Sequence, residues 1–233
     1  EPCLYKELFL MIEMGYKKIT IAAMIARKLK AHGVRRMFGI PGGGSSLDLI
    51  AECASQGIIF QLAKREDSAV IMAAVTAELT GTPGVVLTTK GPGISNAMNG
   101  VAYASLDRAP VLVFTDGFSP NLQSYVTHQV FDQKAMLQPI TKGHSLLAST
   151  DPEAELDRLL LLTMQPPVGP VHVELTAVLA GKKITVTDHR PQTTHVQNEI
   201  KPNQRVNSLI AGAKRPVIII GLEARDTVVA QIG

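Results

Sequence analysis

Charged side chains gather at residues 64–67 (KRED), directly after the apolar segment 58–63 (IIFQLA). The residues that follow are good helix formers and run to Gly81, so Glu66 and Asp67 fall in the first turn of a predicted helix. The helix dipole alone stabilises a carboxylate there by about 0.3–1 kcal/mol, which would account for Glu66 without any function. Held at the end of a strand, the same carboxylate could instead exchange a proton with a ligand.

Two glycine-rich segments, 38–46 (FGIPGGGSS) and 90–96 (KGPGISN), could bring backbone amide groups close to a ligand. Neither completes a nucleotide-binding fingerprint. Ser45 stands where a phosphate-binding loop needs lysine, and Leu47 and Asn96 stand where a dinucleotide fingerprint needs its third glycine. A nicotinamide-binding dehydrogenase domain is therefore disfavoured. A tight turn is the simplest alternative for the first segment, and helix capping is the simplest role for Asn96.

Apolar segments alternate with helix-forming segments between residues 20 and 176. The predicted strands are 34–40, 58–63, 84–89, 110–116 and 170–176, and the predicted helices are 20–32, 47–57, 66–81, 96–107 and 152–165. Thr20 is the predicted cap of the first helix, and Asp151 followed by Pro152 marks the start of the last. Strands that are apolar throughout predict a three-layer α/β/α fold, with a mostly parallel, doubly wound sheet of about six strands.

Parallel sheets of this kind bind ligands at the carboxyl ends of their strands. The loops predicted at that edge are 40–46, 64–66, 90–96 and 116–130. We therefore expect Glu66 and both glycine-rich segments to lie near one another. Asp116 ends a strand at this edge, where we expect it to bond to its own loop, and His172 within a strand reads as structural.

The sequence divides into four parts. We expect an N-terminal extension (1–16), a main domain (17–178), a polar linker (179–201) and the start of a second α/β domain (202–233) that is cut short. In the last part, 202–214 predicts a helix and 215–223 a buried strand.

Composition excludes several classes of function. The 233 residues carry a net charge of +3 from dispersed basic residues and are only 4% aromatic, which gives nucleic-acid binding little support. Cys3 and Cys53 form no disulfide framework, and six histidines show no metal-ligand spacing, so no metal site is expected in this chain. No apolar run reaches the roughly 18 residues of a membrane span, and residues 1–14 make a poor signal peptide. We expect a cytoplasmic protein.

The chain resembles the N-terminal pyrimidine-binding domain of thiamine-diphosphate enzymes, and within them most nearly the acetolactate synthase group of decarboxylases and carboligases (transferases and lyases). Four segments in order carry the resemblance: MFGIPGGG (37–44), KREDSA (64–69), TTKGPGISNAMNGVAYASLDRAPVLVFTD (88–116) and HQVFDQKAMLQPITK (128–142). It extends over about 20–176. In addition, KRPVIIIG (214–221) resembles the opening of the family's middle domain.

The resemblance implies roles for particular residues. Glu66 matches the glutamate that activates the cofactor, and Gln129 matches the active-site glutamine when Pro139 sets the register. The implied cofactor contacts are Gly43, Glu66, Pro92 and Asn96, and the implied substrate contacts are Gly42, Gly44 and His128. Departures from the family pattern at His128 and Val130 leave the substrate open, and Arg65 is a milder departure.

The implied chemistry begins at Glu66, whose carboxylate would bond to the ring nitrogen N1′ of the aminopyrimidine of thiamine diphosphate. That contact favours the imino form of the cofactor, which activates C2 of the thiazolium for attack on a 2-keto acid. Lys64 and Arg65 should then face solvent or a partner chain, since a cation beside Glu66 would oppose its protonation.

The chain has only the pyrimidine half of such a site. Mg²⁺ and the diphosphate would bind a further domain of a neighbouring subunit in a homo-oligomer, so this chain alone should be inactive. The alternatives are a stand-alone pyrimidine-domain subunit or a non-catalytic interaction module, and, less favoured, the dehydrogenase domain.

Overall fold

The computed structural model describes residues 16–118, 127–187, 203–217, 219, 221 and 222. It divides into two compact units, 1–191 and 192–233. The predicted N-terminal extension, except for residue 16, lies outside the described residues.

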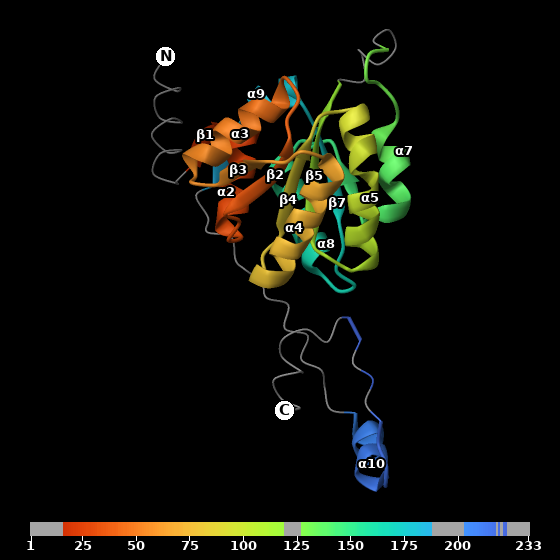
Figure 1. Cartoon of the computed structure of the whole chain (residues 1–233). Coiled ribbons are helices and arrows are strands. Elements are labelled where there is room, and N and C mark those ends of the chain that lie inside the picture. The colour runs from red at the N-terminus through yellow and green to blue at the C-terminus, as the bar shows by residue number, and fades with distance from the viewer. Residues whose placement is uncertain (1–15, 119–126, 188–202, 218, 220, 223–233) are drawn as a thin grey trace. The chain divides into compact units, whose positions relative to one another are not determined.

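The first unit is built on a six-stranded sheet (Figure 1). Its strands are β2 (Arg36–Ile40), β3 (Ile59–Leu62), β4 (Gly84–Thr88), β5 (Val111–Gly117), β6 (His144–Ser145) and β7 (Val171–Thr176). They lie in the order β3-β2-β4-β5-β7-β6, and each neighbouring pair is parallel, as the apolar strand pattern predicts. From β2 the chain moves first to β3 on one side and then to β4 on the other. The β2/β4 boundary is therefore the switch point, where such sheets form a crevice.

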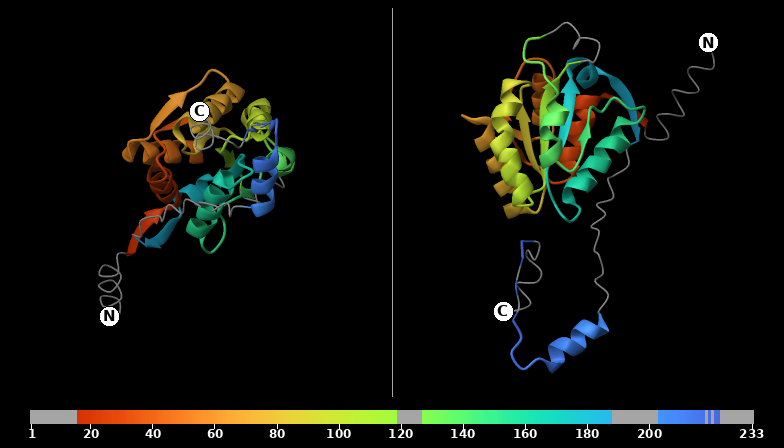
Figure 2. Two further views of the ribbon diagram at one scale, coloured as in Figure 1. Left: turned by 90° about the horizontal axis from the view of Figure 1, so that it is seen from below. Right: turned by 90° about the vertical axis from the view of Figure 1, so that its right-hand side faces the viewer.

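Helices cover both faces of this sheet, which confirms the three-layer α/β/α architecture (Figure 2). One face packs against α4 (Glu66–Thr80), α5 (Pro92–Leu106) and α7 (Gln133–Leu137), which is followed by the short η1 (Gln138–Ile140). The other face packs against α2 (Ile21–Ala31), α3 (Ser45–Ser55), α8 (Pro152–Met164) and α9 (Ala177–Gly181). Strand residues alternate between the two cores: Leu112 and Phe114 belong to one, Val111 and Val113 to the other.

The predicted helix signals are present. The Thr20 side chain accepts a hydrogen bond from Ala23 N (3.1 Å), and Asp151 Oδ1 accepts one from Ala154 N (2.9 Å). Helix α4 ends at Gly81, whose left-handed conformation is the usual glycine stop.

Two helices of the site begin earlier than predicted. Helix α5 starts at Pro92, not at residue 96, because proline fits the first helical position with its fixed φ and missing N–H. Helix α3 starts at Ser45, not at residue 47. Asn96 therefore lies inside a helix, and the expectation that it caps one is wrong.

The prediction of a linker over 179–201 is wrong for its first residues. Residues Lys183–Thr187 form β8, which pairs antiparallel with β1 (Tyr16–Thr20), and Ile184 faces Ile19 across the pair. This segment is polar overall, but it contains a two-residue alternation, in which Ile184 and Val186 pack on the core while Lys183 and Thr185 are exposed. Residues 188–202 lie outside the described residues.

The second unit contains α10 (Gln204–Gly212), with Asn203 as its cap, within the predicted helix 202–214. The described residues of 215–222 form no strand. A strand needs a neighbour to take up its backbone hydrogen bonds, and the described part of this unit has none to offer.

His172 on β7 is a fully buried histidine. Its Nε2 lies 2.8 Å from Thr115 Oγ1, and its ring centroid lies 4.9 Å from that of His144. Burial, with a smaller contribution from His144, lowers the pKa of His172 to about 3 from the ordinary value of 6.5. The structural role expected for His172 fits a neutral imidazole inside the sheet.

His172 should make the fold acid-sensitive. Because its folded-state pKa is depressed, the unfolded chain takes up the proton first. Its contribution to stability is complete above about pH 6.5 and is lost as the pH falls towards 3. Between pH 7 and pH 5 the natural chain should lose about 2 kcal/mol more unfolding free energy than His172→Gln. Urea titrations at both pH values measure this, with the exposed His128→Gln as control; equal losses in natural and His172→Gln chains would contradict it.

Candidate functional site

The turns after β2 and β4 meet at the switch point. A Cβ on Gly42 would overlap Thr89 Oγ1, and a Cβ on Gly93 would lie 2.6 Å from Thr89 Cγ2. Thr89, the residue directly after β4, therefore packs against both Gly42 and Gly93, and only a residue without a side chain fits at these two positions. Sequence reasoning did not single out Thr89, although a polar residue that ends an apolar strand just before a glycine turn is a usable signal.

Glu66 lies at this edge as the first residue of α4, where it is half-buried. Asn96 Nδ2 donates a hydrogen bond to Glu66 Oε2. The two helices approach closely enough for this because Gly100 of α5 packs on α4, where a Cβ would lie 2.7 Å from Val70 Cβ. A Cβ on Gly93 would lie 3.7 Å from Glu66 Oε1. One carboxylate oxygen is thus fixed by Asn96, while the other lies beside the bare backbone of Gly93.

Gln129 lies directly behind the second glycine turn. Gly91 has φ +65°, and a Cβ there would lie 2.6 Å from Gln129 O and 2.8 Å from Gln129 Cβ. Gln129 itself has a positive φ of 61°, which is unusual for a residue with a side chain. The structure therefore brings Gln129 and the turn before Pro92 together, although they are far apart in the sequence.

The described hydrogen bonds of the Asp116 carboxylate go to the start of α3 and not to the described residues of its own loop. Its Oδ1 accepts hydrogen bonds from Ser46 N (2.9 Å) and from the Ser45 hydroxyl, both at the start of α3. Gln133, which sequence reasoning missed, donates from Nε2 to Asp116 O (3.1 Å) and accepts from Gly91 N (3.3 Å). No sequence signal marks Gln133, because a buried glutamine in a short polar helix reads as a surface residue.

The remaining predicted site residues are exposed or half-buried at the same edge. Gly43, Gly44 and Pro92 are exposed, and so is His128, just before Gln129. None of the described contacts joins Gly43, Gly44 or His128 to Glu66. Residues 119–126 of the predicted loop 116–130 lie outside the described residues.

Lys64 and Arg65 are both exposed, as predicted. Arg65 Nη2 lies 2.9 Å from Asp67 Oδ2. This pairing raises the pKa of Arg65 and lowers that of Asp67. The Arg65 guanidinium is therefore paired with Asp67, and Glu66 makes only the last-ranked contribution to its raised pKa.

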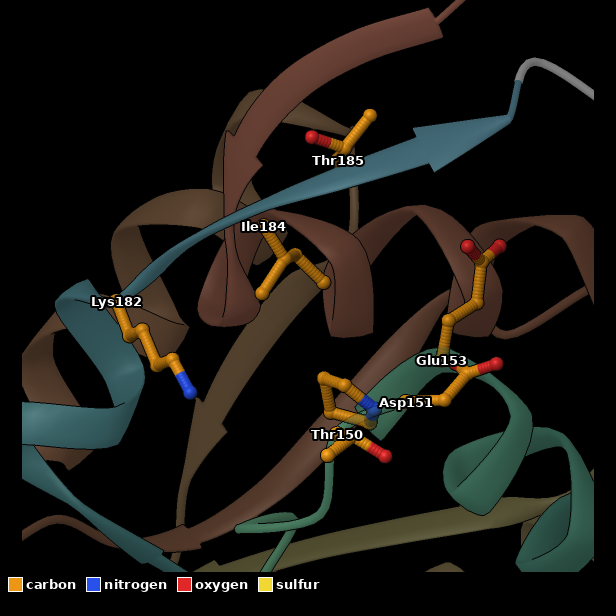
Figure 3. A pocket seen from close by; sticks show the side chains of 7 residues that line it. Thr150, Asp151, Glu153, Lys182, Ile184 and Thr185 are labelled. Carbon is orange, nitrogen blue, oxygen red and sulfur yellow. The ribbon is translucent and has the colours of Figure 1, made fainter.

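A hollow of about 500 Å³ lies elsewhere, between the start of α8 and the α9–β8 segment (Figure 3). It is lined by Thr150, Asp151, Pro152, Glu153, Lys182, Ile184 and Thr185. Its two acids already have partners: Asp151 caps α8, and Glu153 Oε1 lies 2.8 Å from Lys28 Nζ. None of the predicted site residues lines it, so we place the candidate site at the switch point.

In the part of the chain that the structure describes, no group of three His, Cys, Asp or Glu side chains could hold a metal ion. No described helix is both long and apolar enough to cross a membrane.

Residues 19–136 match a family model described as "Thiamine pyrophosphate enzyme, N-terminal TPP binding domain". This match contains both glycine turns, Glu66, Asn96 and Gln129.

Curated relatives match over more of the chain. It is 32% identical over 212 residues to the acetolactate synthase isozyme 3 large subunit of Escherichia coli K12, covering 86% of this chain and 36% of that protein. It is 31% identical over 208 residues to the catabolic acetolactate synthase of Raoultella terrigena (87% and 37%). It is 37% identical over 152 residues to 2-hydroxyacyl-CoA lyase 2 of Bos taurus (65% and 24%). The match therefore covers little more than a third of the length of the two acetolactate synthases and about a quarter of the length of the lyase.

Replacing Gly91 should lower the free energy of unfolding, whereas replacing Gly43 should not. Gly91→Ala combines a strained φ with the contact to Gln129, and should lower the free energy of unfolding by roughly 1–3 kcal/mol. Gly43→Ala is the matched control: no atom lies within 4 Å of its added Cβ, so its effect should stay within about 0.5 kcal/mol. Urea unfolding of both variants measures the difference. Equal effects would show that the Gly91 turn is not constrained as described.

Proposed function

This chain belongs to the thiamine pyrophosphate enzymes, and we propose that it supplies the pyrimidine side of a thiamine diphosphate site in an acetolactate-synthase-like 2-keto acid decarboxylase or carboligase. The observation that carries the proposal is the Glu66 carboxylate, held through Oε2 by Asn96 while Oε1 lies beside Gly93. The substrate class is an inference from the names of the curated acetolactate synthase relatives.

The residues present fit the cofactor's aminopyrimidine. A flat ring needs space beside the carboxylate, and Gly93, which is itself buried, adds no side chain beside Oε1. It also needs a free oxygen, and none of the described hydrogen bonds reaches Glu66 Oε1. A nicotinamide site fits less well, because the third fingerprint position is Asn96, whose side chain is bonded to Glu66.

When bound, thiamine diphosphate supplies a carbon nucleophile and takes up the electrons released as a 2-keto acid loses carbon dioxide. The task of Glu66 is to share a proton with ring nitrogen N1′ of the aminopyrimidine through Oε1. Asn96 holds the other oxygen, so the carboxylate keeps one orientation. Gly43 and Pro92 would contact the cofactor from the two turns.

The residues around the Glu66–Asn96 pair are proposed to contact the substrate. Gln129, fixed against Gly91, is proposed as an active-site amide that orients the substrate. Gly42, Gly44 and His128 are proposed to border the keto acid. The exposed position of His128 suits a residue that meets substrate from the solvent side.

The proposal places the diphosphate and Mg²⁺ on a further domain, contributed by a neighbouring subunit of a homo-oligomer. It includes a cytoplasmic location. This chain alone would then bind the cofactor weakly and be inactive.

Removing the acid at position 66 tests the proposal. In the full-length enzyme, Glu66→Gln keeps the hydrogen bond to Asn96 within reach but cannot share a proton. Exchange of the C2 proton of bound thiamine diphosphate, followed by NMR after transfer to deuterium oxide, should slow by at least about 100-fold. The circular dichroism spectrum should stay unchanged.

The matched control is Asp67→Asn, the next carboxylate along the helix. Asp67 is hydrogen-bonded to Arg65 and Ser68 and not to the glycine turn at 91–93. The C2 proton in the Asp67→Asn enzyme should therefore exchange at a rate within a few-fold of that in the natural enzyme. Near-normal exchange in Glu66→Gln would eliminate the proposed role. Equal losses in both variants would point to a general effect of the start of α4.

A further inference from the structure

Asp116, at the end of β5, is a buried acid that the proposed function does not use. It is 1% exposed, and its Oδ1 accepts hydrogen bonds from Ser46 N (2.9 Å) and the Ser45 hydroxyl. The Ser45 hydroxyl also lies 2.6 Å from Leu175 O on β7. The carboxylate therefore ties the start of α3, and with it the turn at Gly42, to the end of the central strands.

The backbone of the same residue reaches the other glycine turn. Asp116 O accepts a hydrogen bond from Gln133 Nε2 (3.1 Å), and Gln133 Oε1 accepts one from Gly91 N (3.3 Å). Gln133 is 5% exposed, so these bonds are shielded from water. Asp116 is thus the junction of two hydrogen-bonded branches, one to each turn.

The second carboxylate oxygen of Asp116 also meets the first turn. A Cβ on Gly42 would overlap Oδ2, and Oδ2 has no hydrogen-bond partner among the described residues. A buried polar atom without a partner is unfavourable. The bonds made by Oδ1 account for a cap of α3, and they leave the position of Oδ2 against Gly42 without an explanation.

We propose that Asp116 is a positioning residue, which fixes the spacing between the glycine turn at 42–44 and the glycine turn at 91–93. None of its described hydrogen bonds reaches Glu66 or Asn96, and it acts through the backbone of the two turns. On the proposed function, on which this part of the inference rests, the first turn borders the substrate and the second the cofactor. Asp116 therefore sets how the two reacting partners face each other.

Hydrogen exchange on this chain tests the junction without any cofactor. In Asp116→Ala, the amide of Ser46 loses its hydrogen-bond acceptor. The turn that contains Gly91 is then no longer held at a fixed distance from the turn at Gly42. The amides of Ser46 and Gly91 should both exchange at least about tenfold faster, as measured by NMR or by mass spectrometry of the peptides that contain them. Asp116→Asn keeps an acceptor for Ser46 N and should restore most of the protection at both sites.

Two further variants complete the test. Asp151→Ala is the matched control: it removes an aspartate that caps α8 by a bond of the same kind, and it should leave both amides unchanged. Gln133→Leu cuts the other branch. Because coupling is reciprocal, it should speed exchange at Ser46 as well as at Gly91. This variant carries the test if Asp116→Ala does not fold.

The outcomes separate clearly. Faster exchange at Ser46 alone in Asp116→Ala, together with an effect at Gly91 alone in Gln133→Leu, would overturn the proposal and leave Asp116 as a simple helix cap. Unchanged exchange at both amides would also overturn it.

Kinetics of the full-length enzyme provide the second test. Asp116→Ala should lower kcat about 10- to 100-fold, with a change in thiamine diphosphate affinity below about threefold, and Asp116→Asn should recover most of kcat. If exchange at both turns responds but no variant at Glu66 or Asp116 affects turnover, the junction stands and the proposed function fails. If Glu66→Gln slows C2 exchange but Asp116→Ala leaves both amides and kcat unchanged, the function stands and the positioning role fails.

Discussion

The structure depends above all on how closely the turns after β2 and β4 approach each other at the switch point of the sheet. Thr89 fills the space between them, and Gly42 and Gly93 leave it room. A side chain at Gly42 would push the two turns apart, and a side chain at Gly93 would displace Thr89 within its own turn. The starts of α3 and α5 would move as well, because α3 begins three residues after Gly42 and Gly93 is the second residue of α5. The Glu66–Asn96 pair spans the same edge, so its geometry inherits this constraint.

Rigid elements hold the exposed part of the site from behind. Gly43, Gly44 and Asn96 are exposed and Glu66 is half-buried, whereas Asp116 and Gln133, which bond to the start of α3 and to Gly91, are buried. This division is typical of sites at the ends of a parallel sheet, where loops carry the functional residues and the rigid strands hold those loops in position. The hollow beside α8 lacks it, since its acids are used to cap and pair helices.

Family membership and geometry support each other through different observations. The family match rests on residue identities over 19–136, and the geometry rests on which of those residues meet. Asn96 shows why both are needed. As a sequence position it reads as a failed third glycine or a helix cap, but inside α5 it is the donor that fixes one oxygen of Glu66.

The central strands were predictable because a strand buried on both faces must be apolar along its whole length, as Val85, Val86 and Leu87 are. The β1–β8 ribbon and the two-residue β6 escaped prediction. Only alternate residues of the ribbon are buried, and a strand of two residues has no pattern. Helix α5 was placed four residues late, because the GPG segment was read as loop throughout.

The sequence by itself determined the parallel sheet, the edge at which its loops gather and the presence of Glu66 at that edge, since each follows from local composition and the fixed direction of parallel strands. The tertiary structure alone decided which groups meet there. Gln129 behind Gly91, Asn96 on Glu66 and Asp116 on the start of α3 all join segments at least thirty residues apart. Such contacts depend on strand order and helix packing, which no local pattern encodes.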